Sequence, residues 1–285
     1  MKTRKMILSI ILSLGALVVA QILAQLFGSV LILVKIPVFI ANIVAGILYV
    51  IVAYLLIKRL CEKYMKGKMS EYNMPAFKIE LKWGMVALLL PLLVTVVYIL
   101  FLPGTLQQNV LDVSSKLDLV SAGIFFTGFG AGIVEEMVFR GIMMSVIEKR
   151  FSKKVAILVP SVIFGFVHIL GMEFDLISCV LVVLAGTMVG IMFSLIAAET
   201  KSVWNSAVVH AVWNIIIIGG ILSIGTEFSE YSLYSYVLEE NSFFLTGGEF
   251  GIESSVIAVI GYALVCLLVV LSDKKKRWKK GENES

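Results

Sequence analysis

Apolar segments long enough to cross a lipid bilayer recur along the whole chain. A membrane-spanning helix needs about 20 predominantly apolar residues. Eight segments reach or approach that length, at about 6–27, 37–57, 83–102, 119–148, 155–171, 176–198, 203–222 and 255–272. Only 15% of the residues are charged, against about 25% in soluble domains. The sequence therefore predicts an all-α polytopic membrane protein with about eight transmembrane helices. Its first apolar segment is too long for a typical signal peptide, and a signal anchor is the lesser alternative.

The basic residues predict how the chain lies in the membrane. With eight spans, nearly all Lys and Arg fall on one side. They occupy the N-terminus, the loops 58–82 and 149–154, position 201 and the tail 274–280. The other side holds an acidic loop, about 223–254, that contains no Lys or Arg. Because basic loops stay in the cytoplasm, we expect a multi-pass cell-membrane protein with both termini cytoplasmic, and the short loops are typical of bacteria. The net charge of +4 thus predicts topology rather than nucleic-acid binding.

For each of two loops, the sequence fits two different structures. The basic 58–82 segment fits either an interfacial helix or a solvated linker. The acidic 223–254 segment could cap the helix bundle from outside or form a mobile loop. The three cysteines, Cys61, Cys179 and Cys266, have no spacing typical of a disulfide or a zinc site.

Three ionisable residues interrupt the fourth apolar segment. Glu135, Glu136 and Arg140 lie within six residues of one another, and each charge at the bilayer centre costs at least about 2.5–3.5 kcal/mol. The only two histidines of the chain, His168 and His210, also lie in apolar segments. Such residues need partners inside the bundle and are functional candidates.

The polar residues of three segments fall at a similar depth. Glu135, His168 and Asn214 lie 13 to 15 residues from the nearest cytoplasmic basic residue. At about 1.5 Å per residue, each is roughly 20 Å from that boundary, and His210 is about one turn shallower. We therefore expect one site rather than scattered polar groups.

Helical spacing assigns different surroundings to the two carboxylates. Glu136 and Arg140 are four residues apart and can pair on one face, whereas Glu135 is about 100° around the helix. His210 and Asn214 also share a face. Glycines on these segments predict close helix packing.

A carboxylate, two imidazoles and an amide are sufficient for peptide hydrolysis. A carboxylate can accept a proton from water, and imidazole and amide groups can stabilise an oxyanion. No serine or cysteine accompanies them as a nucleophile, so direct attack by water is favoured. Zinc binding by Glu and His is the minority alternative, because the H-E-x-x-H pattern is absent. A purely structural network and a proton-coupled transporter also remain open, although no inverted repeat supports the transporter.

Three motifs carry a resemblance to a known family. They are Glu135-Glu136-Met137-Val138-Phe139-Arg140, Phe164-Gly165-Phe166-Val167-His168 and His210-Ala211-Val212-Trp213-Asn214. In this order they resemble the CPBP family (CAAX protease and bacteriocin-processing, or Abi), which includes the type II CAAX prenyl endopeptidase. The resembling core covers about 118–222. It divides the chain into N-terminal helices at 1–117, this core, and a C-terminal region at 223–285.

The resemblance implies an intramembrane endopeptidase whose site opens toward the cytoplasm. Glu135 resembles the base that activates water, assisted by His168, and His210 and Asn214 resemble the oxyanion stabilisers. Glu136, Arg140 and Phe164 correspond to supporting residues. No cofactor is expected. If the protein were metal-dependent, Glu135, His168 and His210 would be the ligands.

The expected partners are the lipid bilayer and a membrane-associated or lipidated peptide or protein. The competing hypothesis is a non-catalytic immunity or regulatory protein that retains the fold. The sequence carries no signal for an oligomeric state.

Overall fold

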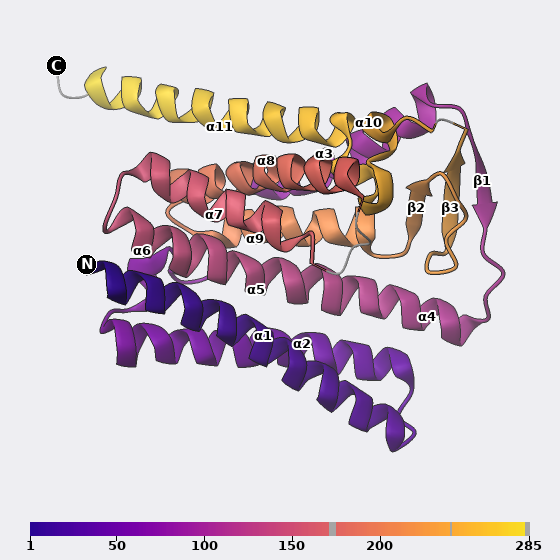
Figure 1. Ribbon diagram of the computed structural model, residues 1–285, viewed down its shortest axis with the longest axis horizontal. Helices are drawn as coiled ribbons and strands as arrows, with labels where there is room; N and C mark the ends of the chain where they lie inside the picture. Colours follow the sequence, from indigo (N-terminus) through magenta and orange to yellow (C-terminus); the bar gives the residue numbers. More distant parts are fainter. Residues whose placement is uncertain (171–174, 240, 283–285) are drawn as a thin grey trace.

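Helices that run along one common direction form the body of the molecule (Figure 1). The computed structural model describes residues 1–170, 175–239 and 241–282, with side chains as far as 272. Three predicted features lie outside the described residues: the end of the fifth span at 171, Glu240 of the acidic loop, and the side chains of the tail at 274–280.

Five of the eight predicted spans are long apolar helices in the part of the chain that is described. They are α1 (Thr3–Leu33), α2 with its extension η1 (Val38–Met65), α3 (Leu81–Phe101), the run from α4 to α6 (Val113–Glu148), and α8 (Leu176–Thr200). By length and composition, each could cross a membrane.

The other three predicted spans are helical but shorter. They are α7 (Lys153–Val167), α9 with η5 (Val203–Ile218), and the apolar part of α11 at Val256–Ser272. The seventh predicted span ends early because Gly219 and Gly220 follow η5, and Gly220 has a φ of +74° that stops the helix. The multi-pass character is thus supported, and the count of eight stays a prediction.

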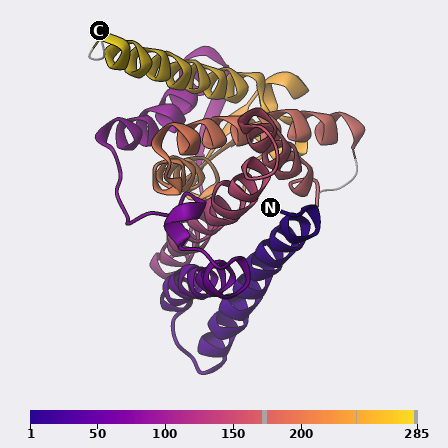
Figure 2. The ribbon, with the colours of Figure 1, turned by 90° about the vertical axis from the view of Figure 1, so that its left-hand side faces the viewer.

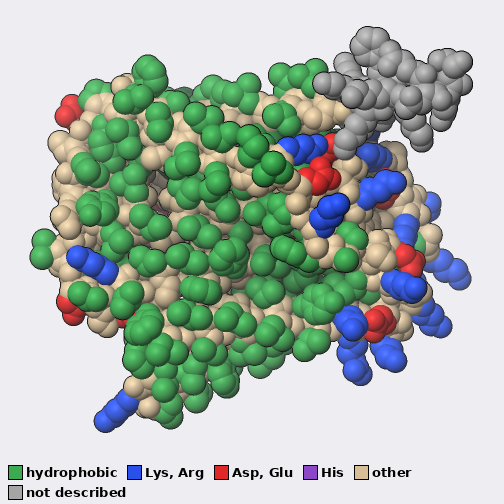
Figure 3. Space-filling view, turned by 180° about the vertical axis from the view of Figure 1, so that it is seen from behind, with side chains coloured by type: hydrophobic (Ala, Val, Ile, Leu, Met, Phe, Trp, Pro, Cys, Tyr) green, Lys and Arg blue, Asp and Glu red, His purple; other side chains and the backbone are tan. Residues whose placement is uncertain are grey.

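The two ends of the molecule differ in charge. Figure 3 shows a broad hydrophobic surface along the body, with most Lys and Arg gathered at one end. The start of α1 and the end of α11 (Val256–Glu282) lie at that basic end (Figure 1). The α1–α2 pair lies on one side of the bundle, and α3 and α11 lie on the opposite side (Figure 2).

A small sheet lies at the opposite end of a molecule that is mostly helical, as predicted. Strand β3 (Tyr234–Leu238) pairs antiparallel with β1 (Gly104–Gln108) and parallel with β2 (Leu222–Gly225). These strands are short, and β1 follows α3 more than 100 residues before its partner. Pairing at such separation leaves no local periodic signal, so the sequence did not indicate it.

The acidic segment caps this end of the bundle. We call residues 222–239 and 241–254 the cap. After the sheet it forms α10 (Phe243–Thr246), η6 (Gly248–Phe250) and η7 (Ile252–Ser254), which pack against α8 and α11. The capping alternative is therefore the correct one.

The basic 58–82 segment also folds onto the bundle. Tyr72, in η2 (Met69–Tyr72), and Met74 are buried. The indole N–H of Trp204 donates to the Pro75 carbonyl at 2.7 Å, and the Val203 N–H donates to the Asn73 carbonyl at 2.8 Å. A freely solvated linker is therefore wrong for residues 72–75.

Glycines bring the helices of the site into close contact, as predicted. A Cβ on Gly132 of α5 (Gly132–Glu136) would lie 2.8 Å from the Cα of Ala211 in α9. A Cβ on Gly186 of α8 would lie 2.8 Å from the Cα of Gly165 in α7. Since any side chain would force the backbones apart, these contacts need glycine. They hold α5, α7, α8 and α9 around a common space.

Candidate active site

Glu136 and Arg140 form a fully buried ion pair. Their side chains are 0% exposed, and Arg140 Nη1 donates to Glu136 Oε1 at 2.7 Å. Arg140 Nη2 also donates to the Gly190 carbonyl at 3.1 Å. The guanidinium lies over the Phe164 ring, 4.5 Å from its centroid, and 5.2 Å from that of Phe193. The predicted pairing is confirmed, and the aromatic rings compensate part of the cost of burying the charge.

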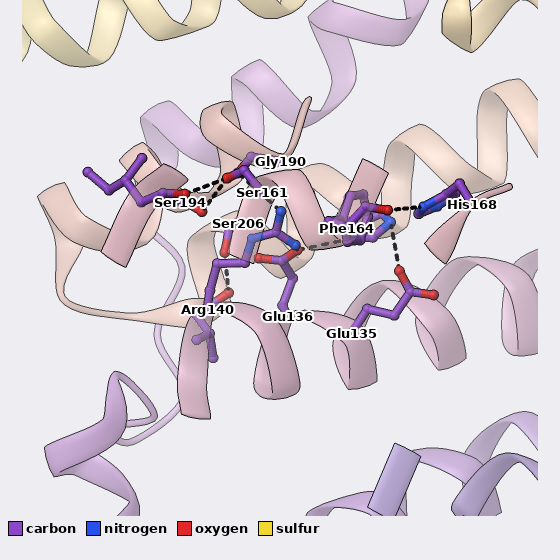
Figure 4. A network of polar contacts seen from close by, with 12 residues as sticks. Glu135, Glu136, Arg140, Ser161, Phe164, His168, Gly190, Ser194 and Ser206 are labelled. Carbon is purple, nitrogen blue, oxygen red and sulfur yellow. Dashed lines mark hydrogen bonds and ion pairs between the residues drawn. The ribbon is translucent and has the colours of Figure 1, made fainter. Parts of the chain in front are cut away.

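Glu135 faces a cavity instead. Its side chain is 24% exposed, although it is the direct neighbour of Glu136 in the helix. The cavity has a volume of about 330 Å³. Glu135, Phe164, His168, His210 and Asn214 all line it. Figure 4 shows Glu135 and Glu136 projecting from neighbouring positions of one helix toward different partners. Five predicted site residues from three predicted spans therefore meet at one cavity.

The imidazole of His210 lies between the two carboxylates. Its Nδ1 is 3.2 Å from Glu136 Oε1, and its Nε2 is 3.9 Å from Glu135 Oε2. The ring stacks on Phe193 with 4.6 Å between centroids. An ionised carboxylate only accepts hydrogen bonds, so Nδ1 must carry the proton of the shorter contact. Nε2 faces Glu135 across the 3.9 Å contact, at the cavity.

The imidazole of His168 is fixed through its Nδ1 atom. It follows the last residue of α7, and its Nδ1 lies 2.6 Å from the Phe164 carbonyl oxygen. Since a carbonyl only accepts, Nδ1 is the protonated nitrogen. Nε2 of the neutral ring therefore keeps a lone pair. The ring packs between Phe164 and Phe250, with centroid distances of 4.5 and 5.7 Å.

Asn214 is fixed by one of its two amide hydrogens. Its Nδ2 donates to the Thr127 carbonyl at 3.0 Å. Thr127 lies in η3 (Ala122–Ala131), a π-helical stretch, and Asn214 begins η5, another one. A third, η4 (Met137–Met143), follows the acidic pair. Such bulges are frequent at functional sites because they alter the hydrogen-bonding ladder. The second N–H of Asn214 can still serve another acceptor.

The cavity has further walls that sequence reasoning missed. Trp213 of α9, Tyr262 of α11, and Phe250 and Glu253 of the cap also line it. Glu253 is one of several glutamates in the acidic segment, and no spacing distinguishes it from the others. Only the fold of the cap brings it to the site.

The cavity lies between the central residues and the cap. Phe250 and Glu253 of the cap line it, and the cap lies at the end opposite to most Lys and Arg. The expected opening toward the cytoplasmic end stays a prediction.

The residues present do not make a complete metal site. Among the described residues, no three His, Cys, Asp or Glu side chains lie close enough to hold one ion. Glu135 and His210 are 3.9 Å apart, but a catalytic zinc site needs three protein ligands. We therefore derive no step through a metal.

Comparison with known proteins identifies the central part of the chain. Residues 118–216 match a family model described as Type II CAAX prenyl endopeptidase Rce1-like. The match agrees with the predicted family over this segment, and it falls inside the predicted core of 118–222. No curated protein and no solved structure matches the chain. The match to this family of membrane proteases, together with the apolar helices of the described residues, supports a multi-pass membrane protein.

Proposed function

We propose that this chain is an intramembrane endopeptidase that hydrolyses a peptide bond of a membrane-associated or lipidated peptide or protein. One observation carries the proposal. The Glu135 carboxylate shares a cavity with His168, His210 and Asn214 inside the segment that matches a protease family.

Glu135 is the proposed general base. It is ionisable, reaches the cavity and has no buried counter-charge as close as the one Glu136 has. A water molecule between Glu135 and His168 would give its proton to the carboxylate as its oxygen attacks the carbonyl carbon. The lone pair on His168 Nε2 would accept a hydrogen bond from the same water and so orient it. General-base catalysis of this kind contributes about 10²–10⁴-fold.

His210 and Asn214 are the proposed oxyanion stabilisers. A ring protonated on both nitrogens lets His210 donate from Nε2, and Asn214 retains a second N–H. Both groups lie four residues apart on one helix face and line the same cavity. Each could donate to the oxygen that becomes negative in the tetrahedral intermediate.

Glu136, Arg140 and Phe164 have positioning roles in this proposal. Glu136 holds Nδ1 of His210, and Arg140 neutralises Glu136. Phe164 contacts three members of the site. Its carbonyl binds His168, its ring lies under the Arg140 guanidinium, and the same ring meets His210 edge-to-face at 5.9 Å.

The proposed orientation has both termini in the cytoplasm. The gathering of Lys and Arg at the end that holds the start of α1 supports it. The cap and the cavity then lie toward the outer face. This orientation favours substrates that enter from the bilayer or the outer side, and a bacterial source stays a prediction.

The test compares peptide ends in membranes of cells that carry wild-type protein, Glu135→Gln or Glu148→Gln at equal abundance. Glu148 ends α6, is exposed and lies outside the cavity, so it controls for the loss of a charge. We expect new N- or C-terminal peptide ends with wild type and Glu148→Gln and none with Glu135→Gln. Identical ends in all three would sink the proposal and favour a non-catalytic partner protein. Loss of cleavage with EDTA, restored by zinc, would favour the zinc-dependent alternative.

A further inference from the structure

A second carboxyl group reaches the catalytic cavity from outside the family segment. Glu253 belongs to η7 in the cap, 37 residues beyond the end of the match at 216. It lines the same cavity as Glu135. The mechanism proposed above gives it no role.

Several contacts fix Glu253 in this position. Tyr262 donates its hydroxyl to the Glu253 backbone carbonyl at 3.0 Å, and the Trp213 side chain hydrogen-bonds the carboxyl group. Trp213 and Tyr262 pack edge-to-face with 5.1 Å between centroids. The turn before Glu253 is closed by Ser254, whose hydroxyl donates to the Gly247 carbonyl at 2.6 Å. Tyr262 thus fixes the backbone of Glu253 and Trp213 fixes its carboxyl group at the cavity wall.

The surroundings of Glu253 favour its neutral form. The titratable groups that line the cavity with it are Glu135, His168, His210 and Tyr262, and no Lys or Arg is among the described lining residues. On the neighbouring cap elements, Glu249 is exposed. The pKa of Glu253 is raised to about 8: burial is the main cause, the Trp213 hydrogen bond opposes the rise, and the charge of Glu135 adds to it. At neutral pH the group therefore carries a proton.

The other polar groups of the cavity are already committed. His168 Nδ1–H is bound to the Phe164 carbonyl, and His210 Nδ1–H is bound to Glu136. In the proposed mechanism Nε2 of His210 faces the oxyanion, and Nε2 of His168 must keep its lone pair to orient water. A departing amine still needs a proton, and Glu253 is a cavity carboxyl group to which the mechanism above assigns no task.

We propose that Glu253 is the general acid of this protease, which donates its carboxyl proton to the nitrogen of the departing amine. The inference rests on the proposed function. Water adds its oxygen to the carbonyl carbon and gives one proton to Glu135. The carbon–nitrogen bond then breaks, its electron pair stays on nitrogen, and the Glu253 proton binds there. Transfer of the proton from Glu135 to Glu253 through water in the cavity restores both groups.

The first test compares Glu253→Gln with Glu249→Gln. Gln keeps the shape and a hydrogen-bond acceptor for Trp213 but gives up no proton. The readout is the rate of cleavage of the membrane protein whose new ends the proteomic comparison identifies, measured between pH 6 and 9.5. We expect wild type and Glu249→Gln to lose activity as the pH rises through about 8. Glu253→Gln should be slower by about 10²–10⁴-fold and should lack that alkaline decline. A wild-type rate and pH profile in Glu253→Gln would overturn the inference.

The second test needs no substrate. Infrared titration of the purified full chain in lipid nanodiscs follows the carbonyl stretch of buried, protonated carboxyl groups. Wild type should lose one such band near pH 8, Glu249→Gln should lose it equally, and Glu253→Gln should lack it. An ionised Glu253 at pH 7 would refute the inference whatever the kinetics show. Cleavage that survives Glu135→Gln would instead refute the proposed function.

Discussion

Glu135 and Glu136 are consecutive residues with opposite surroundings. Glu136 is 0% exposed and pairs at 2.7 Å with an arginine that three phenylalanine rings surround. Glu135 is 24% exposed, and its nearest cationic candidate is His210 at 3.9 Å. One carboxylate is locked, and the other is left available at a cavity.

Helix geometry produces this contrast. Successive residues project about 100° apart, so one of two adjacent side chains can point at the core while the other points at a cavity. The locked carboxylate also holds Nδ1 of His210, which in turn presents Nε2 to the available one. Glu136 therefore positions the imidazole that faces Glu135.

The largest expected difference, in stability and in cleavage rate, is between Glu136→Gln and Glu135→Gln. Glu136→Gln leaves the Arg140 charge buried without its partner, and breaking a buried pair costs about 3–5 kcal/mol. We expect little folded protein, measured as yield and thermal unfolding in detergent. Glu135→Gln should unfold at the wild-type temperature yet lose about 10²–10⁴-fold in cleavage rate. Equal stability of the two variants would break the comparison.

Substitution of Arg140, the partner of Glu136, tests the same buried ion pair. Arg140→Ala strands the Glu136 carboxylate and should also cost about 3–5 kcal/mol, again seen as poor yield and a lowered unfolding temperature. The double variant Glu136→Gln with Arg140→Met removes both charges, so it should recover part of this stability. A stable, well-expressed Arg140→Ala protein would show that the pair does not hold the bundle.

A smaller effect is expected from a substitution in the cavity that Glu135 faces. Asn214→Ala removes one proposed oxyanion donor and should slow cleavage by about 10²–10³-fold. The matched control is Asn42→Ala, because Asn42 also donates to a backbone carbonyl, that of Asp118 at 3.0 Å, but does not line the cavity. Equal rates for the two variants would mean that Asn214 only braces the helix.

The smallest effect is expected from metal removal. If Glu135 is available as a base rather than held as a ligand, EDTA should leave the cleavage rate unchanged, and added zinc should not raise it. The assay is cleavage in isolated membranes before and after chelation. A loss that zinc restores would turn Glu135 from a base into a metal ligand.

The sequence predicted the central site because its signals are local. Glu135, Glu136 and Arg140 stand out in an apolar segment, and the helical period and the membrane depth suffice to relate them to His168 and Asn214. The Glu136–Arg140 pair and the shared cavity were predictable on these grounds, and the resemblance of the three motifs predicted the family. The assigned catalytic roles stay predictions.

The parts that escaped prediction depend on contacts between distant segments. Strand β1 pairs with β3, more than 120 residues further along the chain. The Gly-Thr-Leu-Gln-Gln sequence of β1 contains no pattern that predicts a partner strand. Glu253 reaches the cavity only because the cap folds back over the bundle. No local pattern encodes such a return, so composition suggested an acidic loop and no more.

The enclosure of the cavity by the cap has a consequence for how this protein can be divided. Strand β1, which precedes the family segment, pairs with β3, which follows it. The Tyr98 hydroxyl of α3 likewise donates to the Leu245 carbonyl of α10 at 2.5 Å. The chain segments before and after residues 118–216 therefore contact each other. Residues 118–216 match the family model but do not enclose the cavity alone, so excising them would remove the wall that Phe250 and Glu253 form.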